Sequence, residues 1–158
     1  MKRSFILILF ALLLLPALSL AAPTADAVKS VLDHYNSGVE VILVDFQFCS
    51  AIAREGEQKN ACVDTLDPAT LHKDDKVYLW MNFLVPKETT PKVLIRFNIA
   101  GRTMKTRNLI LSGSFRYRTW ALLPTDKAGT WTIAIDQENG TDFSPISSLN
   151  YQVNAQTE

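Results

Sequence analysis

The amino-acid sequence predicts an all-β domain, an antiparallel two-sheet sandwich of immunoglobulin-like layout, preceded by a short N-terminal helix. From Val39 onward, runs of β-branched and aromatic residues alternate with clusters of glycine, proline, asparagine and aspartate, which is typical of short strands joined by tight turns. Seven such runs are enough to build two packed sheets. They are residues 39–48, 76–85, 92–99, 103–111, 115–123, 130–136 and 146–153.

The chain begins with the pattern of a secretory signal peptide, predicted over residues 1–21. Two basic residues precede an uninterrupted apolar run, Phe5–Leu15, and small residues follow at Ser19 and Ala21, where cleavage requires them. The alternative is an uncleaved anchor, because the apolar stretch through Ala22 is about long enough to span a membrane. We expect cleavage, no stable membrane span afterwards, and a periplasmic or secreted location.

Residues 22–38 predict a short helix followed by a linker. Thr24 can cap the helix, and apolar residues recur at helical spacing until Gly38 ends the pattern. Residues 39–153 then form the sandwich domain, and residues 154–158 are expected to be a disordered tail.

The chain contains two cysteines, Cys49 and Cys62. An oxidising compartment favours a disulfide between them, and closing their loop would contribute roughly 3 kcal/mol on the chain-entropy model. Two inert thiols, or a redox or metal site assisted by His34 or His72, remain as alternatives, although the spacing is not Cys-x-x-Cys. We expect a structural disulfide and no metal or other cofactor.

The long segment 54–75 is polar and becomes acidic at its end. Loops of this length are often functional, but a disulfide would make this one a tethered, solvated excursion. A paired-carboxylate hydrolase could be hidden among its acidic residues, because such pairs leave no local signature. These residues are Asp64, Asp67, Asp74 and Asp75.

Composition excludes several classes of protein. The chain has 158 residues, of which 47% are hydrophobic and 20% charged, so it is neither disordered nor of low complexity. Its formal net charge is +0, but residues 92–127 contain eight bases and one acid. Export makes nucleic acid an unexpected partner for this basic segment.

Strand parity predicts where those bases point. If 92–99, 103–111 and 115–123 form a meander with two-residue turns, the basic side chains share one face and the apolar ones the other. A face rich in arginine suits an acidic protein surface, a phosphate group or an anionic glycan. The alternative is a solvated face whose arginines pair with the acidic segment. The predicted site residues are Arg96, Lys105, Arg107, Arg116, Arg118 and Trp120.

The tryptophans have separate predicted roles. Trp131 alternates with isoleucines and Trp80 lies in an apolar run, so both are expected in the core. Trp120 lies on the predicted basic strand and could stack on a sugar. Carbohydrate binding through Trp120 and its arginine neighbours is therefore the second functional hypothesis.

A family resemblance is carried by four consecutive segments of the second half of the chain. They are Phe115-Arg116-Tyr117-Arg118-Thr119-Trp120, Leu123-Pro124, Gly129-Thr130-Trp131-Thr132-Ile133 and a hairpin over Asp136–Gly140. It resembles the bacterial envelope family called domain of unknown function twenty-nine fourteen. The resemblance covers roughly residues 39–153 and is most specific over 92–140. It implies an envelope β-domain without an assigned activity. Ala121-Leu122-Leu123 departs from the polar continuation that the family often has.

The sequence shows no nucleophile elbow, zinc-protease motif or phosphate-binding glycine loop. We therefore expect an exported, non-catalytic domain that binds an envelope component through the basic face. A protein partner is the first hypothesis, an anionic glycan the second, and a hydrolase with an acidic site the third.

Overall fold

A computed structural model of the chain describes residues 22–155. The predicted signal peptide and residues 156–158 lie outside the described residues. The chain divides into two units, Met1–Ser30 and Val31–Glu158, with the boundary inside helix α2 (Ala25–Ser37). The N-terminus of α2 is capped as the sequence predicts, because the Ala27 amide donates a hydrogen bond to Thr24 Oγ1 at 3.2 Å.

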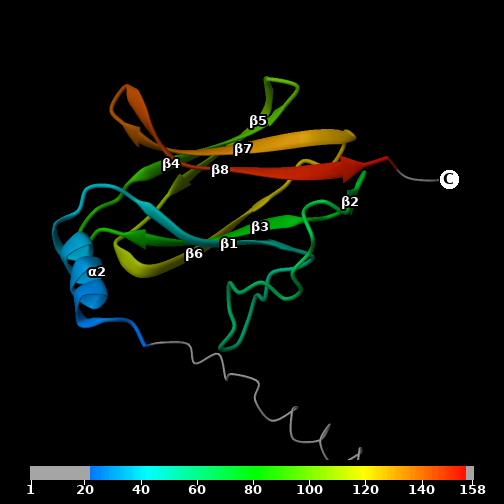
Figure 1. Ribbon diagram of the computed structural model, residues 1–158. Helices are drawn as coiled ribbons and strands as arrows, with labels where there is room; N and C mark the ends of the chain where they lie inside the picture. The colour runs from blue at the N-terminus through cyan, green and yellow to red at the C-terminus, as the bar shows by residue number, and fades with distance from the viewer. Residues whose placement is uncertain (1–21, 156–158) are drawn as a thin grey trace, which may run out of the picture. The chain divides into compact units, whose positions relative to one another are not determined.

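The second unit contains two β-sheets that face each other, which confirms the predicted sandwich (Figure 1). The small sheet has the order β1-β3-β6, and its strands are β1 (Ile42–Cys49), β3 (Tyr78–Val85) and β6 (Ser114–Leu122). The large sheet has the order β2-β8-β7-β4-β5. Its strands are β2 (Leu71–His72), β4 (Lys92–Ile99), β5 (Arg102–Ile110), β7 (Gly129–Asn139) and β8 (Asp142–Asn154).

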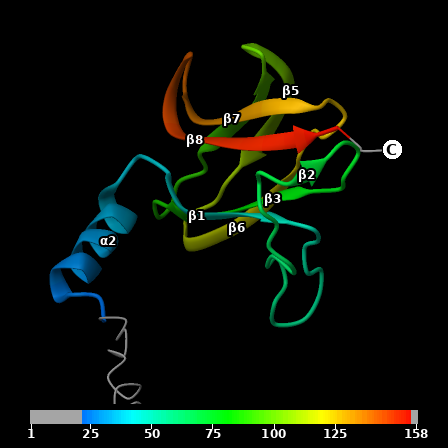
Figure 2. The ribbon, with the colours of Figure 1, turned by 45° about the vertical axis from the view of Figure 1, so that its right-hand side comes forward.

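Strand pairing is antiparallel except at β2, which runs parallel to the end of β8 (Figure 2). In that pairing Leu71 lies opposite Val153 and His72 opposite Asn154. Asn154 is thus part of a strand, so the prediction that a disordered tail begins at this residue is wrong.

The main core lies between the inner faces of the two sheets. Met81 and Phe83 of β3 are fully buried there, together with Ile95 and Phe97 of β4 and Trp131 of β7. Alternation along the strands brings every second side chain to this layer. The predicted core position of Trp131 is confirmed.

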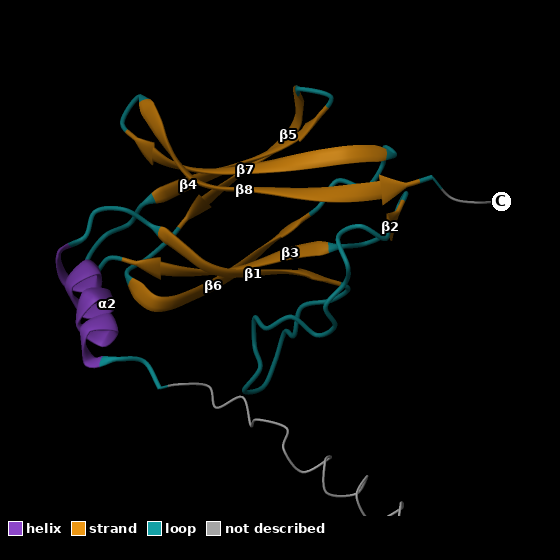
Figure 3. Cartoon of the chain, in the orientation of Figure 1, coloured by secondary structure: helices purple, strands orange, loops and turns teal. Residues whose placement is uncertain are grey.

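A second apolar cluster lies on the outer face of the small sheet. The long loop that follows β1 passes along this side of the sheet (Figure 3). Trp80 is buried in it, and its indole Nε1 donates a hydrogen bond to the carbonyl oxygen of Asn60 at 2.6 Å. The predicted disulfide between Cys49 and Cys62 is formed and holds the loop against this face. Trp80 is therefore a core residue, as predicted, but of this second cluster.

Tyr151 connects the core to the loop after β6. Its hydroxyl donates a hydrogen bond to the carbonyl oxygen of Pro124 at 2.7 Å. Burial, and next the negative charge of Asp126, raise the pKa of this phenol. Tyr151 consequently stays a neutral hydrogen-bond donor.

The predicted three-strand meander is wrong, because β6 belongs to the small sheet. After β5 the chain continues along the segment before β4, with the Gly113 amide donating to the carbonyl oxygen of Thr89 at 3.1 Å, and then crosses to β3. A Cβ atom at Gly113 would lie 2.9 Å from the backbone of Pro86 and Glu88. Glycine is needed here for a close approach of two backbones, whereas the sequence suggested a hairpin turn.

The predicted parity between β4 and β5 is also wrong. The two strands are joined by the expected two-residue turn, with Ile99 opposite Arg102, but Asn98 lies opposite Thr103 and Phe97 opposite Lys105. Met104 is thus an extra residue in β5, a β-bulge. One extra residue moves all the following side chains to the other face of the sheet.

Candidate binding groove

The predicted site residues occupy three separate surfaces. Arg96 points outward from the large sheet, opposite Ala134, whereas Lys105 and Arg107 share a face with the buried residues that pair with them, Phe97 and Ile95. The outer face of the small sheet carries Arg116, Arg118 and Trp120, which alternate with the inward-facing Tyr117, Thr119 and Ala121. No single basic sheet face exists among the described residues.

Lys105, Arg107 and Trp120 nevertheless meet at the open side of the sandwich, between β5 and β6. Two adjoining hollows lie there, and both include Lys105 and Leu122. We call them together the β5–β6 groove. The first, of about 470 Å³, is lined by Asp74, Asp75, Lys76, Met104, Lys105, Leu122, Leu123, Pro124, Thr125 and Asp126. The second, of about 190 Å³, is lined by Phe97, Lys105, Arg107, Trp120, Ala121 and Leu122.

The second hollow has two cations and no acidic residue in its lining. Within residues 22–155, no ion pair involves Lys105 or Arg107. Both side chains are exposed, on a strand that forms the edge of its sheet. Their charges are therefore available to a ligand in the groove.

Arg54 adds a third cation to this region. Its guanidinium carbon lies 4.3 Å from the centre of the Trp120 ring, an attractive cation–π geometry. The Tyr78 ring meets the same indole edge-on, with centroids 5.5 Å apart. Arg54 thus covers one face of the indole, and a sugar ring could stack on that face only by displacing the guanidinium.

Sequence reasoning missed Arg54, since nothing in its neighbourhood distinguishes it from a solvated loop residue. The signal that could have found it is the disulfide, which keeps the loop from Cys49 to Cys62 short and close to the end of β1. That constraint brings the loop over Trp80 and Trp120.

Arg96 has a partner on its own sheet. Its Nη2 donates a hydrogen bond to Asp136 Oδ2 at 2.8 Å, and the Asp136 side chain is only 8% exposed. A cation so closely paired has little charge left for a ligand. The structure separates Arg96 from the groove residues.

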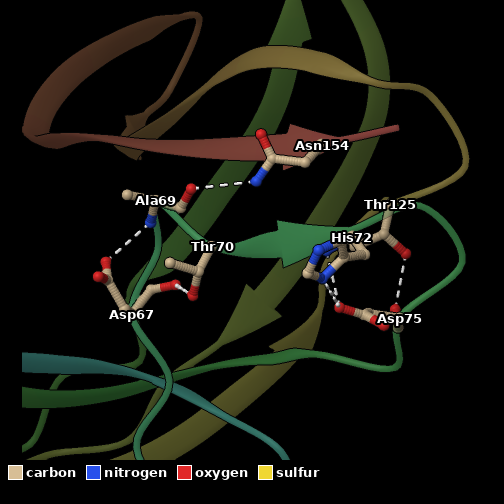
Figure 4. A network of polar contacts seen from close by, with 7 residues as sticks. All are labelled: Asp67, Ala69, Thr70, His72, Asp75, Thr125 and Asn154. Atoms are coloured by element: carbon tan, nitrogen blue, oxygen red, sulfur yellow. Dashed lines mark hydrogen bonds and ion pairs between the residues drawn. The ribbon is translucent and has the colours of Figure 1, made fainter. Parts of the chain in front are cut away.

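One end of the groove is acidic, and hydrogen bonds hold Asp75 in place there (Figure 4). Asp75 Oδ2 accepts a hydrogen bond from the His72 amide at 2.7 Å, and the Thr125 hydroxyl donates to the Asp75 carbonyl oxygen at 2.7 Å. Asp74 and Asp126 line the same hollow. The groove therefore has a cationic part along β5 and an acidic end.

The acidic residues of the long loop have visible structural roles. Asp67 Oδ1 accepts a hydrogen bond from the Ala69 amide at 2.9 Å (Figure 4), and Asp64 Oδ2 accepts one from the Ser50 hydroxyl at 3.3 Å. Across residues 22–155, no cluster of histidine, cysteine and acidic side chains is arranged to hold a metal ion. Nor does any helix in that range have the length and apolar character needed to cross a bilayer.

Comparisons with known proteins give a fold-level likeness. The sequence matches no family model and no curated protein. One of the solved structures similar to it is described as the crystal structure of the C-terminal domain of wzt. The two share 14% sequence identity with a TM-score of 0.49, over 74% of this chain and 75% of the other.

Proposed function

We propose that this chain is an exported, non-catalytic β-sandwich domain of the envelope family it resembles, and that it binds an acidic segment of a partner protein in the β5–β6 groove. The observation that carries the proposal is the second hollow, which Lys105, Arg107 and Trp120 line together with no acidic side chain. Charged donors beside an indole are typical of protein recognition sites. The disulfide and the predicted signal peptide support an extracytoplasmic location.

Two features favour a protein segment over a glycan. Arg54 covers one face of Trp120, so a sugar could stack on that face only by displacing the guanidinium. The groove is also bordered by β5 and β6, each of which pairs with a neighbour on one side only, so backbone hydrogen-bonding groups are available along its rims.

The test compares two charge reversals of equal size in the chain purified after export. Lys105→Glu/Arg107→Glu changes the groove, and Arg116→Glu/Arg118→Glu makes the same change on the outer face of the small sheet. Binding of a glutamate decapeptide is followed by tryptophan fluorescence, with polygalacturonate as the glycan probe. We expect the groove variant to lose about tenfold or more in peptide affinity, and the control variant to stay within about twofold of the wild type.

Equal losses in both variants would mean that the peptide responds only to net charge, and would overturn the proposal. Groove-dependent binding of polygalacturonate without peptide binding would replace the protein partner with an anionic glycan. Far-ultraviolet circular dichroism of each variant checks that the fold is intact.

A further inference from the structure

β5 is more exposed along its length than β6, the other long edge strand that borders the groove. Within the described part of the chain, β5 pairs only with β4, and all of its nine residues except Leu109 are exposed. On the far side of the same sheet, two residues of β2 pair with the end of β8. In the small sheet, the loop amide of Leu66 donates to the carbonyl oxygen of Phe48 at the end of β1. β5 thus presents a long run of backbone groups without a neighbouring strand.

The pairing of β5 with β4 defines which backbone groups point outward. The Leu111 amide donates to the carbonyl oxygen of Pro91 at 2.9 Å, and the register from there to Lys105 is regular. In an antiparallel pair, residues bonded to the partner alternate with residues whose N–H and C=O point away. Counting back from Leu111, the groups of Thr106 and Asn108 therefore point to the free edge.

The side chains on either side of Thr106 face the groove. Lys105 and Arg107 are two residues apart on one face of β5 and line the same hollow. A strand lying beside β5 would therefore place alternate side chains against two cations, and acidic side chains complement them. Nearer to Met104, the hollow is lined by Asp74, Asp75 and Asp126, where a basic or neutral side chain fits better.

The same cations disfavour a second copy of this chain as the occupant. Inward-pointing charges on an edge strand are a common protection against self-pairing, because two such edges set like charges against each other. Lys105 and Arg107 would repel the β5 strand of a second copy and attract an acidic strand. The same two residues therefore disfavour self-pairing and favour an acidic partner.

We propose that β5 accepts an extended acidic segment of a partner protein as an added strand of the large sheet. The N–H and C=O groups of Thr106 and Asn108 form the new ladder, while Lys105 and Arg107 hold acidic side chains at every second position of the segment. This inference rests on the function proposed above and specifies how the groove is used. It predicts a partner segment in which acidic residues alternate with polar ones. The acidic side chains face the groove, and the polar ones lie beside Thr106 and Asn108 on the exposed face.

The first test is Thr106→Pro. Proline removes the N–H group that faces the free edge, and proline is tolerated on edge strands at such positions. The probe is a peptide of alternating glutamate and threonine, and the matched controls are Thr106→Ala and a peptide of the same composition with its glutamates in one block. We expect Thr106→Pro to lose about tenfold or more in affinity, Thr106→Ala to bind as the wild type does, and the block peptide to bind more weakly.

A second measurement does not depend on the folding of a variant. Two versions of the alternating peptide carry N-methyl groups, one on all glutamates and the other on all threonines, and both bind the wild-type chain. Strand addition requires only one of the two sets of amides, so one version should lose binding and the other should keep it. Loss with the threonine version indicates an antiparallel added strand, and loss with the glutamate version a parallel one.

The outcomes separate this inference from the proposed function. Loss of binding in Lys105→Glu/Arg107→Glu, with equal effects of the two N-methylated peptides, would leave the groove as the site and overturn strand addition. Full binding in the groove charge reversal would overturn both.

Discussion

The outer faces of the two sheets differ in their chemistry and in what lies over them. The small sheet carries Tyr78, Trp80 and Trp120 on its outer face, and the disulfide-bonded loop packs over them. Among residues 22–155, the central strands of the large sheet keep partly exposed side chains on their outer face, where Thr132 donates a hydrogen bond to Asn150 Oδ1 at 3.0 Å on the neighbouring strand. An apolar sheet face has to be buried, whereas a face of cross-strand polar pairs can remain in water.

The difference is visible in the burial of single strands. β3 is buried along almost its whole length, on both faces, because it has the main core on one side and the covered cluster on the other. β7 alternates between buried and partly exposed residues over most of its length. The disulfide therefore acts where the fold needs a third layer that the small sheet alone does not supply.

The largest loss of stability is expected from Trp80→Ala, on the covered face of the small sheet. The substitution empties the centre of the covered cluster and removes the hydrogen bond to Asn60. Truncation of a buried aromatic side chain costs about 3–5 kcal/mol of unfolding free energy. Urea unfolding measures it, and a loss below about 1 kcal/mol would mean that the loop contributes little burial.

Removal of the disulfide by Cys49→Ala/Cys62→Ala is expected to rank next, at about 3 kcal/mol, because the unfolded chain regains the entropy of an open loop. The loop should also loosen over Trp80 and Trp120, shifting tryptophan emission to longer wavelength. Unchanged emission together with lowered stability would show that the loop stays in place without its covalent link.

On the large sheet, breaking the ion pair between Arg96 and Asp136 is expected to have a smaller effect on stability. Asp136→Asn leaves the guanidinium without its charged partner and should cost about 1.5–3 kcal/mol. The matched control is Lys92→Gln, which breaks the exposed contact between Lys92 and Glu138 at 3.5 Å. The control should change stability by about 1 kcal/mol or less, and equal costs would contradict the distinction between the two pairs.

The smallest effect is expected from Thr132→Val on the outer face of the large sheet. The shape of the side chain and its preference for strands are retained, and only the exposed hydrogen bond to Asn150 is lost. Thermal unfolding should register a change within about 0.5 kcal/mol. A markedly larger loss would show that this face is a cooperative polar network.

The sequence was sufficient for properties that depend on local pattern. Strand positions follow from runs of β-branched and aromatic residues, and the cysteine pair follows from composition and the predicted export. The distribution of the basic residues depends on two features that leave no periodic signal. The Met104 bulge moves Lys105 and Arg107 to the face opposite Arg96, and the crossing at Gly113 carries Arg118 to the other sheet.

Gln137 has a consequence for the order in which the sandwich can assemble. Its buried side-chain amide accepts a hydrogen bond from the Val41 amide at 2.7 Å and donates one to the carbonyl oxygen of Val39 at 3.1 Å, as a neighbouring strand would. The segment that leads into β1 is thus held by a residue 96 positions later in the chain than Val41. Such a distant contact forms late, so in a chain emerging N-terminus first this segment stays unbonded until β7 has followed, although β1 itself can already pair with β3.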